Sequence, residues 1–179
     1  MEHNIEIELK SVLEADEFSR VSKHFAKIGK VLLDEIVYTE KYAPGDIRLR
    51  RKNGTWSVTV KSGFAADAVR NEKEMPLANE QEVDMLRSLF SMLGLVQAPP
   101  WDAIRRDYVF VHNGEQFEAS MQDIPNFARI LEIEYRGKNL DEPAAENEIR
   151  TIMKELGVKP VNGEEFAAKI AAYKAPNKQ

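Results

Sequence analysis

The stretch NIEIELKSV, residues 4–12, alternates apolar and charged side chains. Because neighbouring side chains of a strand point to opposite faces, this pattern predicts a β-strand with one apolar and one ionisable face. At about 3.3 Å of rise per residue, successive members of the ionisable row lie about 7 Å apart. The row consists of Glu6, Glu8 and Lys10. A solvated surface and the wall of a binding site both fit one such row, so the other strands must distinguish them.

At least four later strands repeat this alternation. Asn53-Gly54 and Asn113-Gly114 suit the positive φ angles of tight turns. They predict one hairpin over residues 46–63 and a second one from strands 102–112 and 116–123. Further strands are predicted over residues 30–42, 68–77 and 128–137. The faces opposite the apolar ones hold Arg48 and Arg50; Ser57, Thr59 and Lys61; Arg70, Glu72 and Glu74; and Glu132 and Glu134.

Helices are predicted between these strands, where apolar residues recur every three or four positions. Their ranges are 15–28, 79–94, 143–156 and a short one at 164–173. Strands followed by helices in this order indicate an α+β fold with a mostly antiparallel sheet. Eight strands can close into a barrel. If the apolar faces point outward beneath the helices, the charged faces line a tunnel.

Composition narrows the classes of protein. The 179 residues include 25 basic and 30 acidic ones, for a formal charge of −5, which argues against a large nucleic-acid surface. The chain has no cysteine, which excludes a disulfide scaffold and thiolate metal sites. We see no leader and no long apolar run, and expect a cytoplasmic protein with no membrane partner. Residues 1–179 are expected to form one domain, with a core over about 4–173 and a frayed C-terminal tail.

A lumen lined by charges of both signs requires a ligand, because unpaired charges removed from water cost several kcal/mol each. Rows of Arg and Lys suit phosphate oxygens, and Arg binds them as a fork. Rows of Glu suit Mg²⁺ or Mn²⁺, which prefer oxygen ligands and bind together with substrate phosphates. A tunnel with both kinds of row fits a metal-bound triphosphate.

The opening row, Glu6-x-Glu8-x-Lys10, resembles the N-terminal signature of the CYTH domains, also called triphosphate tunnel metalloenzymes. Four further pieces follow in that family's order: IRLRR at 47–51, VTVK ending at Lys61, RNEKE at 70–74 and LEIE ending at Glu134. The resemblance covers roughly residues 4–173. It implies an eight-stranded antiparallel β-barrel surrounded by helices, a cofactor of Mg²⁺ or Mn²⁺, and a small-molecule substrate bound through its triphosphate.

The resemblance also implies roles for individual residues. As metal ligands it suggests Glu6, Glu8, Glu72, Glu74, Glu132 and Glu134. As phosphate-binding residues it suggests Lys10, Arg48, Arg50, Lys61, Arg70 and Arg105. Among these, the residues expected to be catalytic are Glu6, Glu8, Lys10 and Arg105.

Two positions depart from the family pattern. The family usually has a lysine two residues before the arginine matched to Arg105, and here that position is Ala103. The family's late aspartate falls on Gln122 or Asp123, and the alternation along the strand favours Gln122. Together the two departures remove one cation and one carboxylate from the expected site.

Three functions follow from the resemblance. The first is a triphosphatase acting on inorganic, nucleoside or thiamine triphosphate. The second is a class IV adenylyl cyclase; Ser62-Gly63 stands where cyclases commonly have Gly-Pro, and their Ser-Tyr is missing around Tyr173, which favours the hydrolase. The third, motivated by Ala103 and Gln122, is a barrel that binds polyphosphate or a nucleotide without turnover. Either a monomer or a homodimer is compatible with the sequence.

Overall fold

The computed structural model describes residues 5–62, 69–162, 165–166 and 168, with backbone only at residues 5, 6, 69 and 70. The strands are β1 Ile5–Leu13, β2 Lys30–Ala43, β3 Asp46–Lys52, β4 Thr55–Ser62, β5 Val69–Leu77, β6 Val96–Gln97, β7 Trp101–His112, β8 Glu115–Ile124 and β9 Ala128–Tyr135. The helices are α1 Ala15–Ile28, α2 Glu80–Met92 and α3 Glu142–Glu155. The short helix predicted over 164–173 and the predicted frayed tail lie largely outside the described residues.

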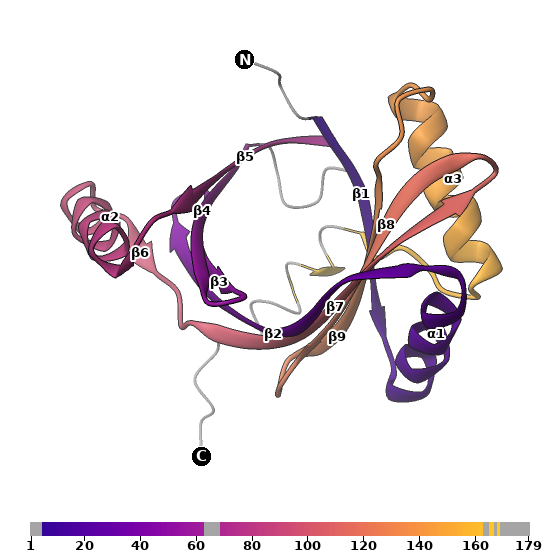
Figure 1. Cartoon of the computed structure of the whole chain (residues 1–179), viewed down its shortest axis with the longest axis horizontal. Coiled ribbons are helices and arrows are strands. Elements are labelled where there is room, and N and C mark those ends of the chain that lie inside the picture. The colour runs from indigo at the N-terminus through magenta and orange to yellow at the C-terminus, as the bar shows by residue number, and fades with distance from the viewer. Residues whose placement is uncertain (1–4, 63–68, 163–164, 167, 169–179) are drawn as a thin grey trace.

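Eight of these strands form a closed antiparallel barrel, as the sequence predicted. Hydrogen bonds join them in the order β3-β4-β5-β1-β9-β8-β7-β2. The ring closes because residues 38–42 of β2 pair with residues 47–51 of β3. The short strand β6, which the sequence analysis missed, pairs with β2 beside this closure. Figure 1 shows β5, β4 and β3 curving from β1 round to β2 to complete the ring.

Both hairpin turns form where the sequence placed them. Asn53 and Gly54 connect β3 to β4 with φ angles of 51° and 71°, and Asn113 and Gly114 connect β7 to β8 with φ angles of 48° and 84°. Asparagine and glycine tolerate this left-handed region better than other residues. The turns fix the register of each hairpin, and the register decides which side chains face the lumen.

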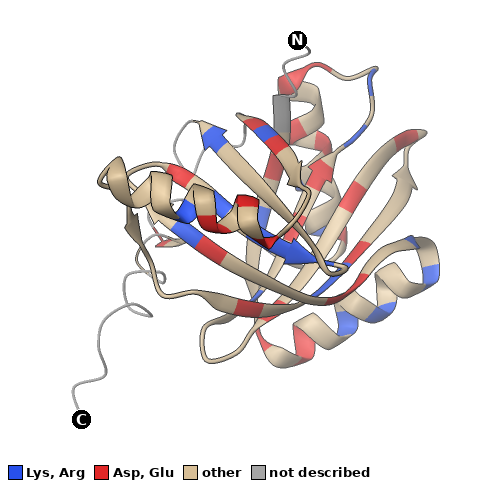
Figure 2. Cartoon of the chain, turned by 60° about the vertical axis from the view of Figure 1, so that its left-hand side comes forward, with Lys and Arg blue, Asp and Glu red and all other residues tan. Residues whose placement is uncertain are grey.

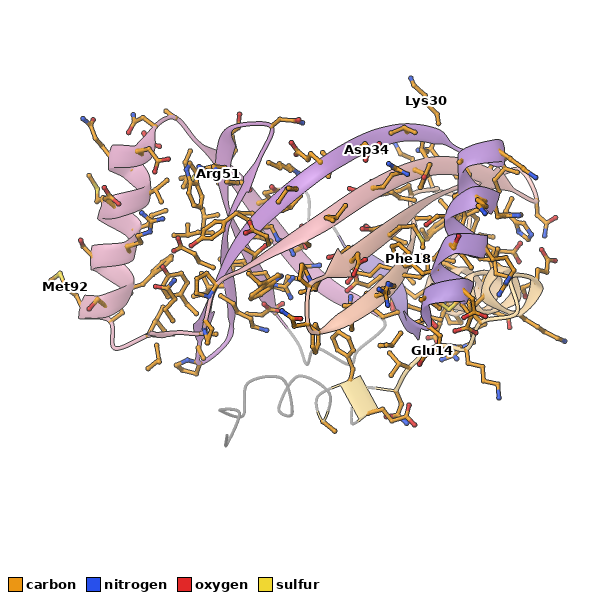
Figure 3. All side chains as sticks on the ribbon, turned by 90° about the horizontal axis from the view of Figure 1, so that it is seen from below. Glu14, Phe18, Lys30, Asp34, Arg51 and Met92 are labelled. Carbon is orange, nitrogen blue, oxygen red and sulfur yellow. The ribbon has the colours of Figure 1, made fainter. Side chains whose placement is uncertain are left out.

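The apolar faces of the strands point outward beneath the helices, which confirms the predicted sidedness. Helices α1 and α3 cover one part of the barrel, where Phe25 and Ile149 are fully buried in the larger core cluster. Helix α2 covers another part, where Val83 and Phe90 pack on Leu49 and other residues of β2 to β5. Figure 3 shows α1 and α2 at opposite ends of the molecule. On each strand, the side chains that alternate with these apolar ones therefore face the lumen.

Helix starts follow the expected capping chemistry. The Asn79 side chain accepts a hydrogen bond from the Glu82 backbone at the start of α2, and Asp141 does the same for Ala144 at the start of α3. Such caps satisfy backbone N–H groups that have no partner within the helix. Among the described residues, no helix combines the length and the hydropathy needed to cross a bilayer.

Candidate active site

The barrel encloses a polar cavity of about 120 Å³. Figure 2 shows acidic and basic positions interleaved along the strands of its wall. The basic lining residues are Arg48, Arg50, Lys52, Lys61, Arg105 and Arg136. The acidic lining residues are Glu8, Glu72, Glu74, Asp107, Glu118, Glu132 and Glu134. Six cations and seven carboxylates leave the lining with one net negative charge.

The structure brings most of the sequence-predicted site residues to this cavity. Lys10 is not among the lining residues but bonds to two of them. The backbone positions of Glu6 and Arg70 face each other across β1 and β5, and their side chains lie outside the described part. Sequence-predicted residues that line the cavity are Glu8, Arg48, Arg50, Lys61, Glu72, Glu74, Arg105, Glu132 and Glu134.

Lys10 lies between two carboxylates of the cavity wall. Its ammonium group bonds to Glu8 and lies 3.0 Å from Glu132 Oε1. Burial alone lowers the pKa of Lys10, but the charges of Glu132 and Glu8 outweigh it, so this pKa lies above its usual value. Burial alone raises the pKa of Glu132, but Lys10 and Arg105 outweigh it and hold this pKa well below its usual value. Both groups are therefore ionised at neutral pH.

Lys61 makes the corresponding link on the other side of Glu8. Its ammonium group lies 2.6 Å from Glu72 Oε2 and 3.9 Å from Glu8 Oε1. Burial alone raises the pKa of Glu72, but Lys61 and then Arg50 outweigh it, so this pKa lies below its usual value. Glu8 therefore shares two lysines with two other carboxylates.

Two arginines of the lining are held by aspartates two residues away on the same strand face. Arg48 donates from Nε and Nη2 to Asp46, at 2.7 and 2.8 Å. Arg105 donates from Nε to both oxygens of Asp107, at 2.8 and 3.0 Å. Since Asp107 engages only Nε, both terminal nitrogens of Arg105 stay available to a ligand. The sequence analysis missed these aspartates, although their spacing from the arginines carried the signal.

Arg50 differs from the other cations of the lining. Among the described residues it forms no ion pair, although Lys52, Lys61, Arg48 and Arg105 each do. Burial, followed by the positive charges of Arg48 and Arg105, lowers the pKa of Arg50 to about 10. The guanidinium group stays charged at neutral pH, and the charges of Glu132 and Glu72 offset its burial and the repulsion of Arg48 and Arg105 only in part. This region of the lumen therefore favours an anion.

The carboxylates lie in a row on the opposite part of the wall. Glu8 on β1 is directly across from Glu134 on β9, which is directly across from Glu118 on β8. Like charges in directly opposed positions destabilise a sheet unless a cation lies between them. Arg136 serves here, at 3.2 Å from Glu118 and 2.8 Å from Glu134.

This row has the chemistry of a divalent-metal site without the closed geometry of one. Its carboxylate oxygens are the ligands that Mg²⁺ and Mn²⁺ prefer. Within the described residues, however, no three acidic or histidine side chains are close enough together to hold an ion. Glu118 was not among the predicted ligands, although it alternates with Ser120 and Gln122 on β8.

The two departures from the family pattern have structural consequences. Ala103 is 1% exposed and packs with Ile124 and Ile130, so the lumen-facing residues at that end of the barrel are apolar. A lysine would place its charge in this apolar cluster. Gln122 donates from Nε2 to Glu132 Oε2 at 2.8 Å, so it replaces a carboxylate with a neutral donor that restrains Glu132.

Solved structures share this fold. A protein of Pyrococcus horikoshii OT3 has a TM-score of 0.66 and 22% identity, with 92% of this chain and 99% of that chain covered. A candidate adenylate cyclase of Vibrio parahaemolyticus has a TM-score of 0.68 and 16% identity, with 95% and 99% covered. A Hippeastrum adenylyl cyclase homologue, described with a dominant triphosphatase activity, has a TM-score of 0.58 and 13% identity, with 98% and 99% covered.

Sequence comparison identifies the family. No curated protein matches the chain. The family model of the CYTH domain matches residues 4–167, which is most of the chain and includes every strand of the barrel. With the charged lumen, this match confirms the resemblance seen in the sequence. The chain belongs to the CYTH domain family, whose enzymes act on triphosphates.

Proposed function

We propose that this protein is a triphosphatase that binds a triphosphate in the barrel lumen together with a divalent metal. Arg50 supports the proposal most directly, because it is a half-buried cation that forms no ion pair with any described residue and lies close to the charges of Arg48 and Arg105. A phosphate oxygen at this position would relieve the repulsion among the three guanidinium groups.

The charge of the lumen supports a metal-bound ligand over a bare one. Counted with Lys10, which bonds to two lining carboxylates, the wall holds seven cations and seven carboxylates, so its total charge does not favour a free polyanion. A triphosphate adds several more negative charges, which divalent cations must accompany. We propose that Glu8, Glu134 and Glu118 would hold such a cation, once it displaces Arg136 from the last two and draws the three carboxylates closer together than they are in the free protein. The predicted ligand Glu6 would join this set, and Glu72, Glu74 and Glu132 would form further acidic wall.

In this mechanism the protein positions the substrate and stabilises charge. Arg50, Arg48 and the terminal nitrogens of Arg105 would hold phosphate oxygens, while Lys10 and Lys61 would neutralise charge that develops during cleavage. The metal ion, when bound, would polarise the phosphate oxygens that it contacts. Hydrolysis requires water to reach the terminal phosphorus, and the chain's own residues supply alignment and electrostatic stabilisation.

Hydrolysis is favoured over cyclisation for two reasons. A cyclase must also seat an adenine and activate a ribose hydroxyl, whereas Ala103, Ile124 and Ile130 leave the residues at one end of the lumen apolar and packed. The Hippeastrum homologue of the same fold is described with a dominant triphosphatase activity. We therefore expect phosphate release, with inorganic triphosphate as the simplest substrate.

The direct test is an assay of purified protein with inorganic triphosphate, ATP and thiamine triphosphate, each with Mg²⁺ or Mn²⁺ and each with excess EDTA. Phosphate release that needs the metal supports the proposal, and accumulation of cyclic AMP with pyrophosphate would reassign the chain as a cyclase. If no substrate is cleaved, the triphosphatase is refuted.

Ala103 and Gln122 favour a second candidate, a barrel that binds a triphosphate without cleaving it. A large thermal shift with triphosphate and Mg²⁺ but no turnover would support this binder, since a ligand at a hundredfold excess over Kd stabilises by about 2.7 kcal/mol. The matched pair Arg50→Gln and Arg51→Gln tests the site in either case. Arg51 stacks outside the lumen, 5.8 Å from the Trp56 ring, so only the Arg50 variant should lose the ligand-induced shift.

A further inference from the structure

Ser120 is a cavity-lining residue whose hydroxyl group has no hydrogen-bond partner. It lies in the middle of β8, is 4% exposed, and its Oγ forms no hydrogen bond within the described part of the chain. Its direct neighbours across the sheet are Asp107 on β7 and Glu132 on β9. A buried hydroxyl without a partner is unfavourable, and such groups in native proteins call for an explanation.

The two neighbouring carboxylates are engaged by other donors, and neither accepts a hydrogen bond from Ser120. Asp107 accepts from Arg105 with both oxygens. Glu132 accepts from Gln122 and lies against Lys10. The Ser120 hydroxyl is thus without a hydrogen-bond partner among the described residues, beside two carboxylates that bind other donors.

We infer that Ser120 is a ligand-binding residue whose hydroxyl donates a hydrogen bond to a non-bridging oxygen of a phosphate group in the cavity. This inference rests on the proposed function and adds a residue to it. A phosphate oxygen supplies the missing acceptor. A neutral donor suits this place, because Asp107 and Glu132 flank it and an additional cation would compete with Arg105 and Lys10 for them.

Two other hydroxyls on the lumen face provide a comparison. Ser57 and Thr59 on β4 also lack hydrogen-bond partners, but neither lines the cavity. Thr59 is 0% exposed and is directly across from Arg48. These two positions therefore separate the effect of an unpartnered hydroxyl from that of a residue that lines the cavity.

The experiment measures two quantities for each variant: the melting temperature of the free protein, and the Kd for tripolyphosphate in saturating Mg²⁺ by calorimetry. Ser120→Ala should melt at or above the wild-type temperature, because it removes an unpaired polar group. It should weaken binding about tenfold or more, as expected for a lost hydrogen bond to a charged acceptor. Ser120→Thr, which keeps the hydroxyl, should restore at least half of the lost affinity on a logarithmic scale.

Two matched controls separate contact from burial. Thr59→Val removes an unpartnered hydroxyl away from the cavity, so it should leave Kd unchanged and the melting temperature at or above that of the wild type. Ser11→Ala removes a hydroxyl that is 2% exposed and donates to the Lys159 carbonyl at 2.7 Å, outside the lumen. That variant should melt lower than the wild type and bind with the same Kd.

Failure of the inference is distinguishable from failure of the proposed function. If the wild type binds magnesium tripolyphosphate and Ser120→Ala binds it equally well, Ser120 is not a ligand contact and the triphosphate site still stands. A lower melting temperature for Ser120→Ala would show that the hydroxyl has a structural partner and would also overturn the inference. If the wild type does not bind, both are refuted together.

Discussion

The ion pair between Glu40 and Arg87 should stabilise the fold without contributing to the active site. Glu40 is on β2, faces away from the lumen toward α2, and is only 2% exposed. Its carboxylate accepts from Arg87 Nη2 at 2.5 Å, from Arg87 Nε at 3.2 Å and from the Tyr42 hydroxyl at 2.7 Å. Arg87→Met would leave this buried carboxylate without its cation.

The expected loss of stability follows from that burial. Removing one partner of a buried ion pair typically costs about 3 to 5 kcal/mol, and we take about 3 kcal/mol because Arg87 itself is partly exposed. For a chain of this size that corresponds to a fall in melting temperature of about 6 to 12 °C. Glu40→Gln combined with Arg87→Met should recover at least half of the loss, since the buried charge is then gone while Tyr42 keeps an acceptor.

The pH dependence of the loss gives a second check. Burial alone raises the pKa of Glu40, but the hydrogen bonds and charge of Arg87 outweigh it, so this pKa lies below its usual value in the wild type. Ionised Glu40 therefore stabilises the wild type above a pH of about 4.3, and this contribution disappears as pH falls through its folded pKa. Without Arg87, burial raises the pKa of Glu40. The difference between wild type and Arg87→Met should then be largest near pH 7 and shrink steadily as pH falls, first through the raised pKa of Glu40 in the variant and then through its lowered pKa in the wild type.

Urea denaturation at several pH values measures this difference, and tripolyphosphate binding below the melting temperature monitors the lumen. A loss of less than 1 kcal/mol at pH 7, or a loss that grows as pH falls, would refute the reasoning. If the variant loses the expected free energy of unfolding and its Kd for tripolyphosphate is unchanged, the ion pair serves only to hold α2 against the barrel.

Three further predictions concern the lumen. Glu8→Gln should abolish most metal-dependent activity but change the melting temperature little, since Lys10 and Lys61 each keep a second carboxylate. Wild-type activity in this variant would show that Glu8 has only a structural role. Asp107→Asn should raise KM more than it lowers kcat, because Arg105 loses the charge that orients it, and unchanged kinetics would contradict this. The pKa of Glu132 is held low by Lys10 and Arg105. Ionised Glu132 therefore stabilises the fold above a pH of about 4.3, and this contribution disappears on acidification. Glu132→Gln should accordingly reduce the slope of unfolding free energy against pH by up to about 1.4 kcal/mol per pH unit between about pH 5 and 2. Denaturation curves of equal slope against pH for both proteins would exclude that contribution.

Much of the fold could be predicted from the sequence because its determinants are local. Alternation with period two marked the strands, spacing of three and four residues marked the helices, and Asn-Gly pairs marked both hairpin turns. The helix predicted over residues 15–28 has the observed bounds, Ala15–Ile28. Strand β6 was missed because two residues are too few to show any periodicity.

The same alternation determined which residues could face the lumen, but not how their charges would pair. Pairing depends on barrel closure and register, which bring together residues far apart in sequence, such as Glu8 and Glu134. Only the tertiary structure shows that Arg50 forms no ion pair within the described part of the chain and that Asp107 holds Arg105. The sequence by itself determined a barrel with a charged interior, because side-chain periodicity is a property of each strand alone. The tertiary structure decided which of those charges remain available to a ligand, because that depends on distances between different strands.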